Sequence, residues 1–196
     1  MKNNKPTFLL VTGCAGSGKT TLGKKIAKKL NWTYIDKDTV VNLFTDWILS
    51  DKGFLKNNRE SKVYCNNIRP LEYKTVFKIS EENLKLGNSI VLVIPFIAQI
   101  SDFGQWEQLC KEFNLNFENV KVKFVWIKHD IEQEYKRIKQ RNAERDNYKL
   151  THWEEYEKKI KDISLDKKYN SYIFENNTNN IDDICIDELI KWLNIK

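Results

Sequence analysis

The sequence predicts an α/β fold in which helices cover both faces of a parallel β-sheet. Apolar, strand-like segments alternate with amphipathic helical segments along the 196 residues. Strands that are separated by helices are typical of parallel sheets. The run Ser89–Ile94 is almost continuously apolar, as expected for a strand that is buried on both faces. The length suits one domain with a proper core, so we expect a single domain over residues 1–196.

The first half of the chain contains two predicted strands and three predicted helices. In order, they are a strand at Thr7–Thr12, a helix at Lys19–Leu30, a short strand at Thr33–Ile35, a helix at Thr39–Leu49 and a helix at Leu71–Leu86. The second helix carries the apolar residues Val40, Leu43, Phe44 and Trp47. The stretch Ser50–Pro70 is polar and contains chain breakers, which predicts irregular structure. Gly87 is expected to follow the end of the third helix in a left-handed conformation.

The second half repeats the alternation. In order, we expect a strand at Ser89–Ile94, a helix at Phe103–Phe113, a strand at Val120–Ile127, helices at Ile131–Asn142 and Thr151–Ile163, a strand at Ser171–Phe174 and a helix at Ile181–Leu193. The last helix is amphipathic, and its periodicity turns a set of apolar side chains toward the core: Ile181, Ile184, Leu189 and Trp192.

Composition narrows the class of protein. Hydrophobic residues make up 41% and charged residues 31% of the chain, and no apolar run approaches the roughly 18 residues of a membrane span. The N-terminus lacks a signal-peptide cleavage region, so we expect a cytoplasmic protein without a membrane. The four cysteines are far apart and have no histidine cluster nearby, which argues against a metal centre or a disulfide framework. The net charge of +6 suits an anionic ligand, but the lysines are spread along the chain and do not by themselves indicate nucleic-acid binding.

The strongest motif lies between the first predicted strand and the first predicted helix. The segment from Gly13 to Thr20 reads GCAGSGKT and fits G-x-x-x-x-G-K-[ST], a phosphate-binding loop. Glycines let successive backbone N–H groups converge on phosphate oxygens, and the helix adds its positive N-terminal end. The ammonium of Lys19 can reach the β- and γ-phosphates, while the Thr20 hydroxyl can hold Mg²⁺. The nucleotide-binding residues are therefore predicted to be Gly13, Ala15, Gly16, Ser17, Gly18, Lys19, Thr20 and Thr21.

Two carboxylates follow the second predicted strand, at Asp36 and Asp38. In a parallel sheet the carboxyl ends of neighbouring strands share one crevice, so both should lie near the glycine loop. One could help to hold Mg²⁺, for which Asp36 is the candidate. The other, Asp38, could accept the proton of an attacking hydroxyl. An alternative with equal support is that Asp38 caps the helix predicted to begin at Thr39.

Three arginines recur every four residues, at Arg137, Arg141 and Arg145. If this segment is helical, they form one stripe of guanidinium groups, which suits the charge that develops during phosphoryl transfer. The alternative is a solvated charged face, because Glu132, Glu134 and Glu144 could pair with them locally. Arginine in place of the surrounding lysine favours a functional role, because its planar fork fits phosphate better.

Together, these features resemble the small P-loop kinases, which include adenylate, shikimate and gluconate kinases, chloramphenicol phosphotransferase and zeta-toxin-like kinases. The resemblance rests on the glycine loop, the Asp36-x-Asp38 pair, the strand that ends in Pro95-Phe96, and the arginine segment followed by Trp153 and Tyr156. It implies a three-layer P-loop NTPase fold with five parallel strands in the order 2-3-1-4-5. It also implies a helical lid at about residues 131–150, an acceptor region at about 38–70, and ATP and Mg²⁺ as cofactors.

The resemblance also suggests roles for particular residues. Lys19, Asp38, Arg137 and Arg141 would be catalytic, and Arg145 would contact the nucleotide. Asp38, Arg59 and Arg69 would bind the acceptor, the arginines through an acidic group; surface solubility explains those two arginines equally well. Many relatives carry an aspartate at the end of the third strand, before Pro-Phe, whereas this chain has Ile94 there. Either Asp36 takes over that part in the Mg²⁺ shell, or metal binding is weaker.

The sequence therefore predicts an ATP-dependent kinase that phosphorylates a hydroxyl group of a small molecule. A kinase that acts on the 5′-hydroxyl ends of nucleic acids is an alternative, and it would show a strong dependence of activity on salt. A nucleotide-binding switch with slow ATP hydrolysis is another.

Overall fold

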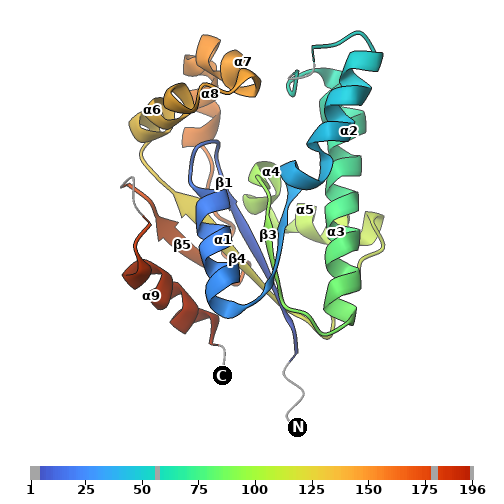
Figure 1. The fold of residues 1–196 in the computed structure, drawn as a ribbon, viewed down its shortest axis with the longest axis vertical. Helices are drawn as coiled ribbons and strands as arrows, with labels where there is room; N and C mark the ends of the chain where they lie inside the picture. Colours follow the sequence, from blue (N-terminus) through green and yellow to red (C-terminus); the bar gives the residue numbers. More distant parts are fainter. Residues whose placement is uncertain (1–4, 56–57, 178–180, 195–196) are drawn as a thin grey trace.

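A computed structural model describes residues 5–55, 58–177 and 181–194, with the side chain of Arg145 left out. Its centre is one sheet of five parallel strands, which are β1 (Thr7–Gly13), β2 (Thr33–Asp36), β3 (Ile90–Val93), β4 (Lys121–Lys128) and β5 (Ser171–Glu175). Their order is β2-β3-β1-β4-β5, which confirms the predicted order (Figure 1). All seven residues of β1 are buried, because this strand lies in the middle of the sheet with helices on both of its faces.

Helices cover both faces of the sheet. On one face lie α1 (Lys19–Leu30) and α9 (Asp183–Leu193), packed over a core that includes Leu9, Val11 and Ile26. On the other face lie α3 (Arg69–Lys85) and α5 (Phe103–Glu112), over a larger aromatic core around Phe8 and Phe77. Alternate residues of β1 point to opposite faces, so one strand contributes to both cores.

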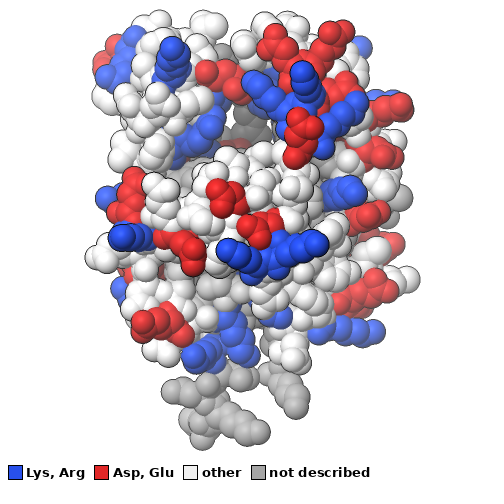
Figure 2. All heavy atoms as spheres, turned by 180° about the vertical axis from the view of Figure 1, so that it is seen from behind, with Lys and Arg blue, Asp and Glu red and all other residues white. Residues whose placement is uncertain are grey.

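The remaining helices gather at the end of the sheet where the strands terminate. They are α2 (Lys37–Asp51), a π-helical turn η1 (Tyr64–Ile68), α4 (Ile97–Ile100), α6 (Ile131–Arg141), a 3₁₀ turn η2 (Glu144–Asp146), α7 (Asn147–Thr151) and α8 (Trp153–Lys161). Figure 1 shows α6, α7 and α8 grouped on one side of this end and α2 on the other, with the start of β1 and the end of α9 at the opposite end of the molecule. In Figure 2 the surface is hollowed between these two groups, and basic and acidic side chains are intermixed over the face shown.

Several helix boundaries differ from those predicted. The stretch predicted to be irregular contains the turn η1, which leads directly into α3 at Arg69 with Pro70 in the first turn, where proline has no helical hydrogen bond to lose. The helix predicted at 151–163 begins only at Trp153, as α8, because His152 takes a non-helical conformation, and the short helix α7 before it was not predicted. The helix predicted at 131–142 ends at Arg141, because Asn142 adopts a left-handed conformation with φ of 46°.

Burial also differs from the pattern in two helices. Ile184 was expected to face the core, but it is 72% exposed at the start of α9. In α2 the buried residues are Lys37, Val41, Thr45 and Leu49, spaced four apart. The larger apolar residues of that helix, Leu43, Phe44 and Trp47, lie on its exposed side. In the part of the chain that the structure describes, no helix is both long and apolar enough to cross a bilayer.

Candidate active site

The glycine loop connects the central strand β1 to helix α1, so the helix N-terminus points to the end of the sheet where the strands terminate. Gly18 is the N-cap residue of α1 and has φ of 96°, a left-handed conformation that side chains rarely adopt. A Cβ at this position would also lie 2.6 Å from the side-chain nitrogen of Asn176. Glycine is therefore required here for two reasons, and the loop keeps the backbone turn that phosphate-binding loops need.

Lys19 lies folded back over its own loop. Its Nζ donates a hydrogen bond to the backbone carbonyl of Cys14, with a distance of 2.6 Å. Burial lowers the pKa of this ammonium from 10.5 to about 8, since removal from water disfavours the charged form. An anion bound in the loop would raise this pKa again, because a nearby negative charge favours the ammonium. Cys14 itself is no nucleophile at neutral pH, because burial raises the pKa of its thiol to about 12.

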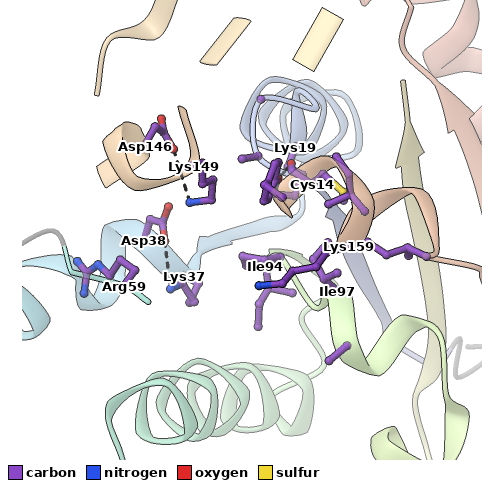
Figure 3. A pocket seen from close by; sticks show the side chains of 18 of the residues that line it. Cys14, Lys19, Lys37, Asp38, Arg59, Ile94, Ile97, Asp146, Lys149 and Lys159 are labelled. Atoms are coloured by element: carbon purple, nitrogen blue, oxygen red, sulfur yellow. Dashed lines mark hydrogen bonds and ion pairs between the residues drawn. The ribbon is translucent and has the colours of Figure 1, made fainter. Parts of the chain in front are cut away.

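A cavity of about 950 Å³ opens directly at this loop. Most of the predicted site residues line it, and they come from both sides of the hollow: Gly13, Ala15, Gly16, Gly18, Lys19, Thr20, Thr21, Asp36, Asp38, Arg59, Arg69, Arg137 and Arg141. Figure 3 shows Lys19 on one side of this cavity, Asp38 and Lys37 on another, and Lys159 reaching in from α8. Ser17, which also belongs to the loop, is fully buried and does not line the cavity. The predicted contact from the side chain of Arg145 lies outside the described part of the chain.

Asp36 joins the loop to the second strand. Its Oδ2 accepts hydrogen bonds from the Thr20 hydroxyl at 3.1 Å and from the Tyr34 hydroxyl at 2.9 Å. Its Oδ1 accepts hydrogen bonds from the backbone N–H groups of Asp38, at 2.9 Å, and Thr39, at 3.4 Å. Asp36 is therefore the N-cap residue of α2, which begins at Lys37. The alternative that Asp38 caps a helix beginning at Thr39 was wrong, because the helix starts two residues earlier.

The pair Thr20–Asp36 fits the ligand preference of Mg²⁺. A hydroxyl and a carboxylate oxygen lie 3.1 Å apart at the edge of the cavity, and Mg²⁺ prefers hard oxygen donors while keeping several of its waters. The end of β3 offers no carboxylate, because Ile94 lies there fully buried. Among the described residues, no group of three or more His, Cys, Asp or Glu side chains could form a metal site made by the protein alone. Any Mg²⁺ here would therefore depend on phosphate oxygens for part of its shell.

Asp38 lies one residue into α2, and its side chain faces the cavity. Its Oδ1 is 3.2 Å from the ammonium of Lys37, which is buried and also bonds Glu72 at 2.8 Å. Burial alone would lower the pKa of Lys37, but Tyr64 and the two carboxylates outweigh burial and raise it. Lys37 therefore stays charged and fixes the Asp38 carboxylate at the cavity wall. Because Asp36 caps the helix, Asp38 is not needed for capping.

The predicted arginine stripe is only partly formed. Arg137 and Arg141 are one turn apart on α6, but the helix ends there and Arg145 belongs to the separate turn η2, so the single stripe over three arginines was wrong. Arg137 donates hydrogen bonds to the backbone carbonyls of Gly16, at 3.5 Å, and Asn176, at 3.0 Å. Arg141 forms an ion pair with the buried carboxylate of Asp146. Its Nε, at 3.0 Å, and its Nη2 both donate hydrogen bonds to Asp146 Oδ2. Both guanidinium groups reach the cavity near the loop.

Behind the part of the cavity wall formed by Lys37, Arg59 and Tyr64 lies a buried carboxylate that the sequence did not single out. Glu72 is 3% exposed and accepts hydrogen bonds from Lys37, from the Thr45 hydroxyl at 2.6 Å and from the Tyr64 hydroxyl at 2.9 Å. The reason that it was missed is that Glu72 reads as an ordinary charged residue in the first turn of a helix. The periodicity of α3, which buries Tyr73, Val76 and Phe77, was the available signal.

The two arginines of the predicted acceptor region, Arg59 and Arg69, differ in their partners. Arg59 bonds Asp46 at 2.7 Å and lies 3.7 Å from Glu72, so its charge is balanced within the protein. Arg69 lies over the Tyr64 ring at 5.0 Å and donates to the backbone carbonyl of Arg59 at 3.3 Å. In the described part of the chain, no carboxylate lies within ion-pair distance of Arg69. Of the two arginines, Arg69 is the one whose charge is left for a ligand.

A second polar cluster supports the loop from behind. Glu134 of α6 is 1% exposed, and its Oε1 accepts a hydrogen bond from the Tyr156 hydroxyl at 2.5 Å. Its Oε2 lies 2.9 Å from His129 Nε2, but this ring nitrogen is not aligned for a hydrogen bond. The Tyr156 hydroxyl lies close to the backbone of Ala15 in the glycine loop. Glu134 is therefore not part of a solvated charged face. The cluster links α6 and α8 to the glycine loop.

Comparison with known proteins supports this architecture. A family model described as an AAA domain, AAA_33, matches residues 8–163. A cytidylate kinase from Fusobacterium nucleatum subsp. nucleatum is 38% identical over 61 residues, which are 31% of this chain and 28% of that protein. The chain spans less than half of the length of each cytidylate kinase that it matches.

Solved structures share the fold over almost the whole chain. A sugar kinase from Janibacter sp. HTCC2649 superposes with a TM-score of 0.65 at 14% identity, covering 97% of this chain and 95% of that one. A shikimate kinase from Bacteroides thetaiotaomicron superposes with a TM-score of 0.57 at 18% identity, covering 96% and 99%. At these identities the likeness concerns the fold, which is that of the small P-loop kinases. Because the AAA_33 model matches well over half of the residues, this chain belongs to the AAA_33 family of AAA domains and has a P-loop kinase fold.

Proposed function

We propose that this protein is an ATP-dependent kinase that transfers the γ-phosphoryl group to a hydroxyl group of a small molecule. The observation that carries this proposal is the place of Asp38. Its carboxylate lines the same cavity as the glycine loop and Lys19, it is held there by Lys37, and it is not used as a helix cap. A carboxylate fixed opposite a phosphate-binding loop suits a general base that accepts the proton of an attacking hydroxyl.

The phosphates are expected to bind between the loop and the lid helices. Lys19 exchanges its bond to the Cys14 carbonyl for phosphate oxygens, and Arg137 and Arg141 approach the same oxygens from α6. Thr20 and Asp36 would hold Mg²⁺, directly or through water, and the ion would neutralise charge on the β- and γ-phosphates. We assign residues 131–150 to a lid, because they supply both arginines and cover the cavity from one side.

We further propose that the acceptor carries an anionic group, which Arg69 binds. Arg69 faces the cavity without an acidic partner among the described residues, while Arg59 is already balanced by Asp46 and Glu72. A half-buried guanidinium gains most from a ligand that brings a carboxylate or phosphate to it. Arg59 then positions Tyr64, whose ring lies 5.2 Å from it, and does not contact the acceptor.

The experiment begins with matched pairs of neutral and anionic hydroxyl compounds, which are incubated with the protein, ATP and Mg²⁺. Mass spectrometry detects the gain of a phosphoryl group. We expect products from the anionic members, and Arg69→Met should raise the KM for the acceptor about tenfold or more while leaving the KM for ATP unchanged. The matched control is Lys62→Met, an exposed cation of the same region. Products from neutral members alone would contradict the anionic acceptor but not the kinase.

The role of Asp38 is tested by Asp38→Asn, which keeps the size of the side chain but cannot take a proton. We expect kcat to fall about a hundredfold to ten-thousandfold, with the melting temperature and ATP affinity retained. Asp51→Asn makes the same change at an exposed position of the same helix and should leave kcat unchanged. A near-normal kcat in Asp38→Asn would eliminate this residue as the base.

A second candidate is a kinase whose acceptor is a phosphate group, which the matches to cytidylate kinases favour. A phosphate acceptor is already ionised near neutral pH, so no proton has to be removed during attack. The same variant therefore separates the two candidates. If nucleoside monophosphates are converted and Asp38→Asn retains its kcat, the phosphate acceptor is correct and the hydroxyl acceptor is not.

A further inference from the structure

Helix α2 exposes a run of large apolar side chains that the active site does not use. Leu43 is 82%, Phe44 71% and Trp47 68% exposed, all within five consecutive residues. Single exposed hydrophobic residues are common on proteins, but contiguous groups of large ones usually mark an interaction surface. We call Leu43, Phe44 and Trp47 the apolar flank of α2.

The flank lies apart from the active site because of helical geometry. At 100° per residue, the buried positions Lys37, Val41, Thr45 and Leu49 form one stripe, which packs on the protein. The cavity-lining residues Asp38 and Asn42 lie on one side of that stripe. The apolar flank lies on its other side. A partner seated on the flank would therefore leave the cavity open to nucleotide and acceptor.

We propose that the apolar flank is a homodimer interface, in which α2 packs antiparallel against α2 of a second copy around a twofold axis. Such an arrangement is self-complementary: with the axis close to Thr45, Leu43 of each copy lies opposite Trp47 of the other, and the two Phe44 side chains lie beside the axis. Closed twofold pairing of one patch with itself is the commonest form of oligomer. Between Leu43 and Trp47 the sequence has one charged residue, Asp46, and its carboxylate is paired with Arg59 of the same chain at 2.7 Å.

The area of the flank is consistent with a weak dimer. The two aromatic side chains, Phe44 and Trp47, cover roughly 150–250 Å² each, so the flank, together with Leu43, presents on the order of 400–500 Å² per copy. Two copies would then bury on the order of 900 Å² in total, which is below the roughly 1,000 Å² of a stable specific interface and in the range of weak, transient ones. The dimer should therefore dissociate on dilution. Its formation depends on apolar contact, so salt should affect it little.

The test is sedimentation velocity of the full chain over a wide range of concentration, in low and high salt. The expected mass rises from the monomer mass of 23.3 kDa toward twice that value as the concentration increases. Trp47→Glu and Phe44→Glu should each raise the dissociation constant about tenfold or more. Leu86→Glu places the same charge on a residue that is 79% exposed at the end of α3 and should leave association unchanged.

The melting temperature and the affinity for an ATP analogue are measured for each variant to verify that it is folded. A wild-type protein that stays monomeric at all concentrations overturns the proposal. A dimer that survives Trp47→Glu in folded protein also overturns it, because association would then use another surface. Loss of association in the two flank variants alone, with nucleotide affinity retained, supports it.

Discussion

The affinity of the protein for ATP should fall as the pH rises above 8, and Lys19 is the cause. Burial lowers the pKa of its ammonium to about 8 in the free protein. Below this pH, Lys19 carries the charge that phosphate oxygens bind. Above it, the proton is lost and the ammonium contributes less. The terminal phosphate of a nucleotide has lost its second proton well below pH 8, so the charge of the ligand stays constant over this range.

The magnitude follows from the fraction of free protein in which Lys19 is charged. With a pKa of about 8, roughly 90% of the molecules carry the proton at pH 7 and about 3% at pH 9.5. If binding requires the ammonium, the dissociation constant therefore increases about thirtyfold between these two pH values. Proximity to phosphate raises the pKa of Lys19 in the complex, so binding at high pH takes up a proton.

The assay is calorimetric titration with a non-hydrolysable ATP analogue and Mg²⁺ at several pH values between 7 and 9.5, at constant ionic strength. Titrations at pH 9 in buffers of different ionisation enthalpy measure the proton uptake. Lys19→Arg is the matched control, because a guanidinium stays charged throughout and its variant should show an almost flat profile. A flat profile in the unmutated protein, or the same slope in Lys19→Arg, would refute the assignment of this pH dependence to Lys19.

Three further predictions concern packing and motion. Gly23→Ala should lower the free energy of unfolding by about 1–3 kcal/mol, because the new Cβ would lie 2.4 Å from Val93 Cγ2 and 3.3 Å from the Tyr34 ring. Thermal melting measures the loss, and an unchanged melting temperature would mean that α1 shifts without cost. Glu72→Ala should lower the free energy of unfolding by about 3–5 kcal/mol, because it removes a partner of the buried Lys37. The double variant Lys37→Met/Glu72→Leu should recover most of that loss, and equal instability of both variants in urea unfolding would contradict the ion-pair explanation. If residues 131–150 form a lid that closes over the phosphates, hydrogen exchange in 131–146 should slow when nucleotide and acceptor are both bound. Protection at the glycine loop alone would count against a lid.

Much of the fold could be predicted from the sequence because its signals are local. The alternation of apolar segments predicted all five strands, and the continuous apolar run of β3 indicated a position inside the sheet. The glycine loop could also be recognised from the sequence, because phosphate binding requires its glycines, lysine and threonine at fixed spacing. Helix ends were less certain, because they depend on single residues such as Asn142, whose left-handed conformation ends α6.

Other features were decided only by the tertiary structure. The sequence left the roles of Asp36 and Asp38 open, and the start of α2 at Lys37 made Asp36 the cap. Arg59 and Arg69 were equivalent in the sequence, and they differ only because Asp46 and Glu72 approach one of them across the fold.

The burial of the apolar flank of α2 also could not be predicted from the sequence. Local periodicity states which residues of a helix share a face, but not which face the rest of the molecule covers. The sequence therefore placed Leu43, Phe44 and Trp47 on a helix without deciding whether they are buried, and in the structure they lie on the surface. What the sequence determined by itself was the order of the strands and helices along the chain and the phosphate-binding loop, because both depend on neighbouring residues. Pairing and burial depend on residues that are distant in the chain, and only folding brings those together.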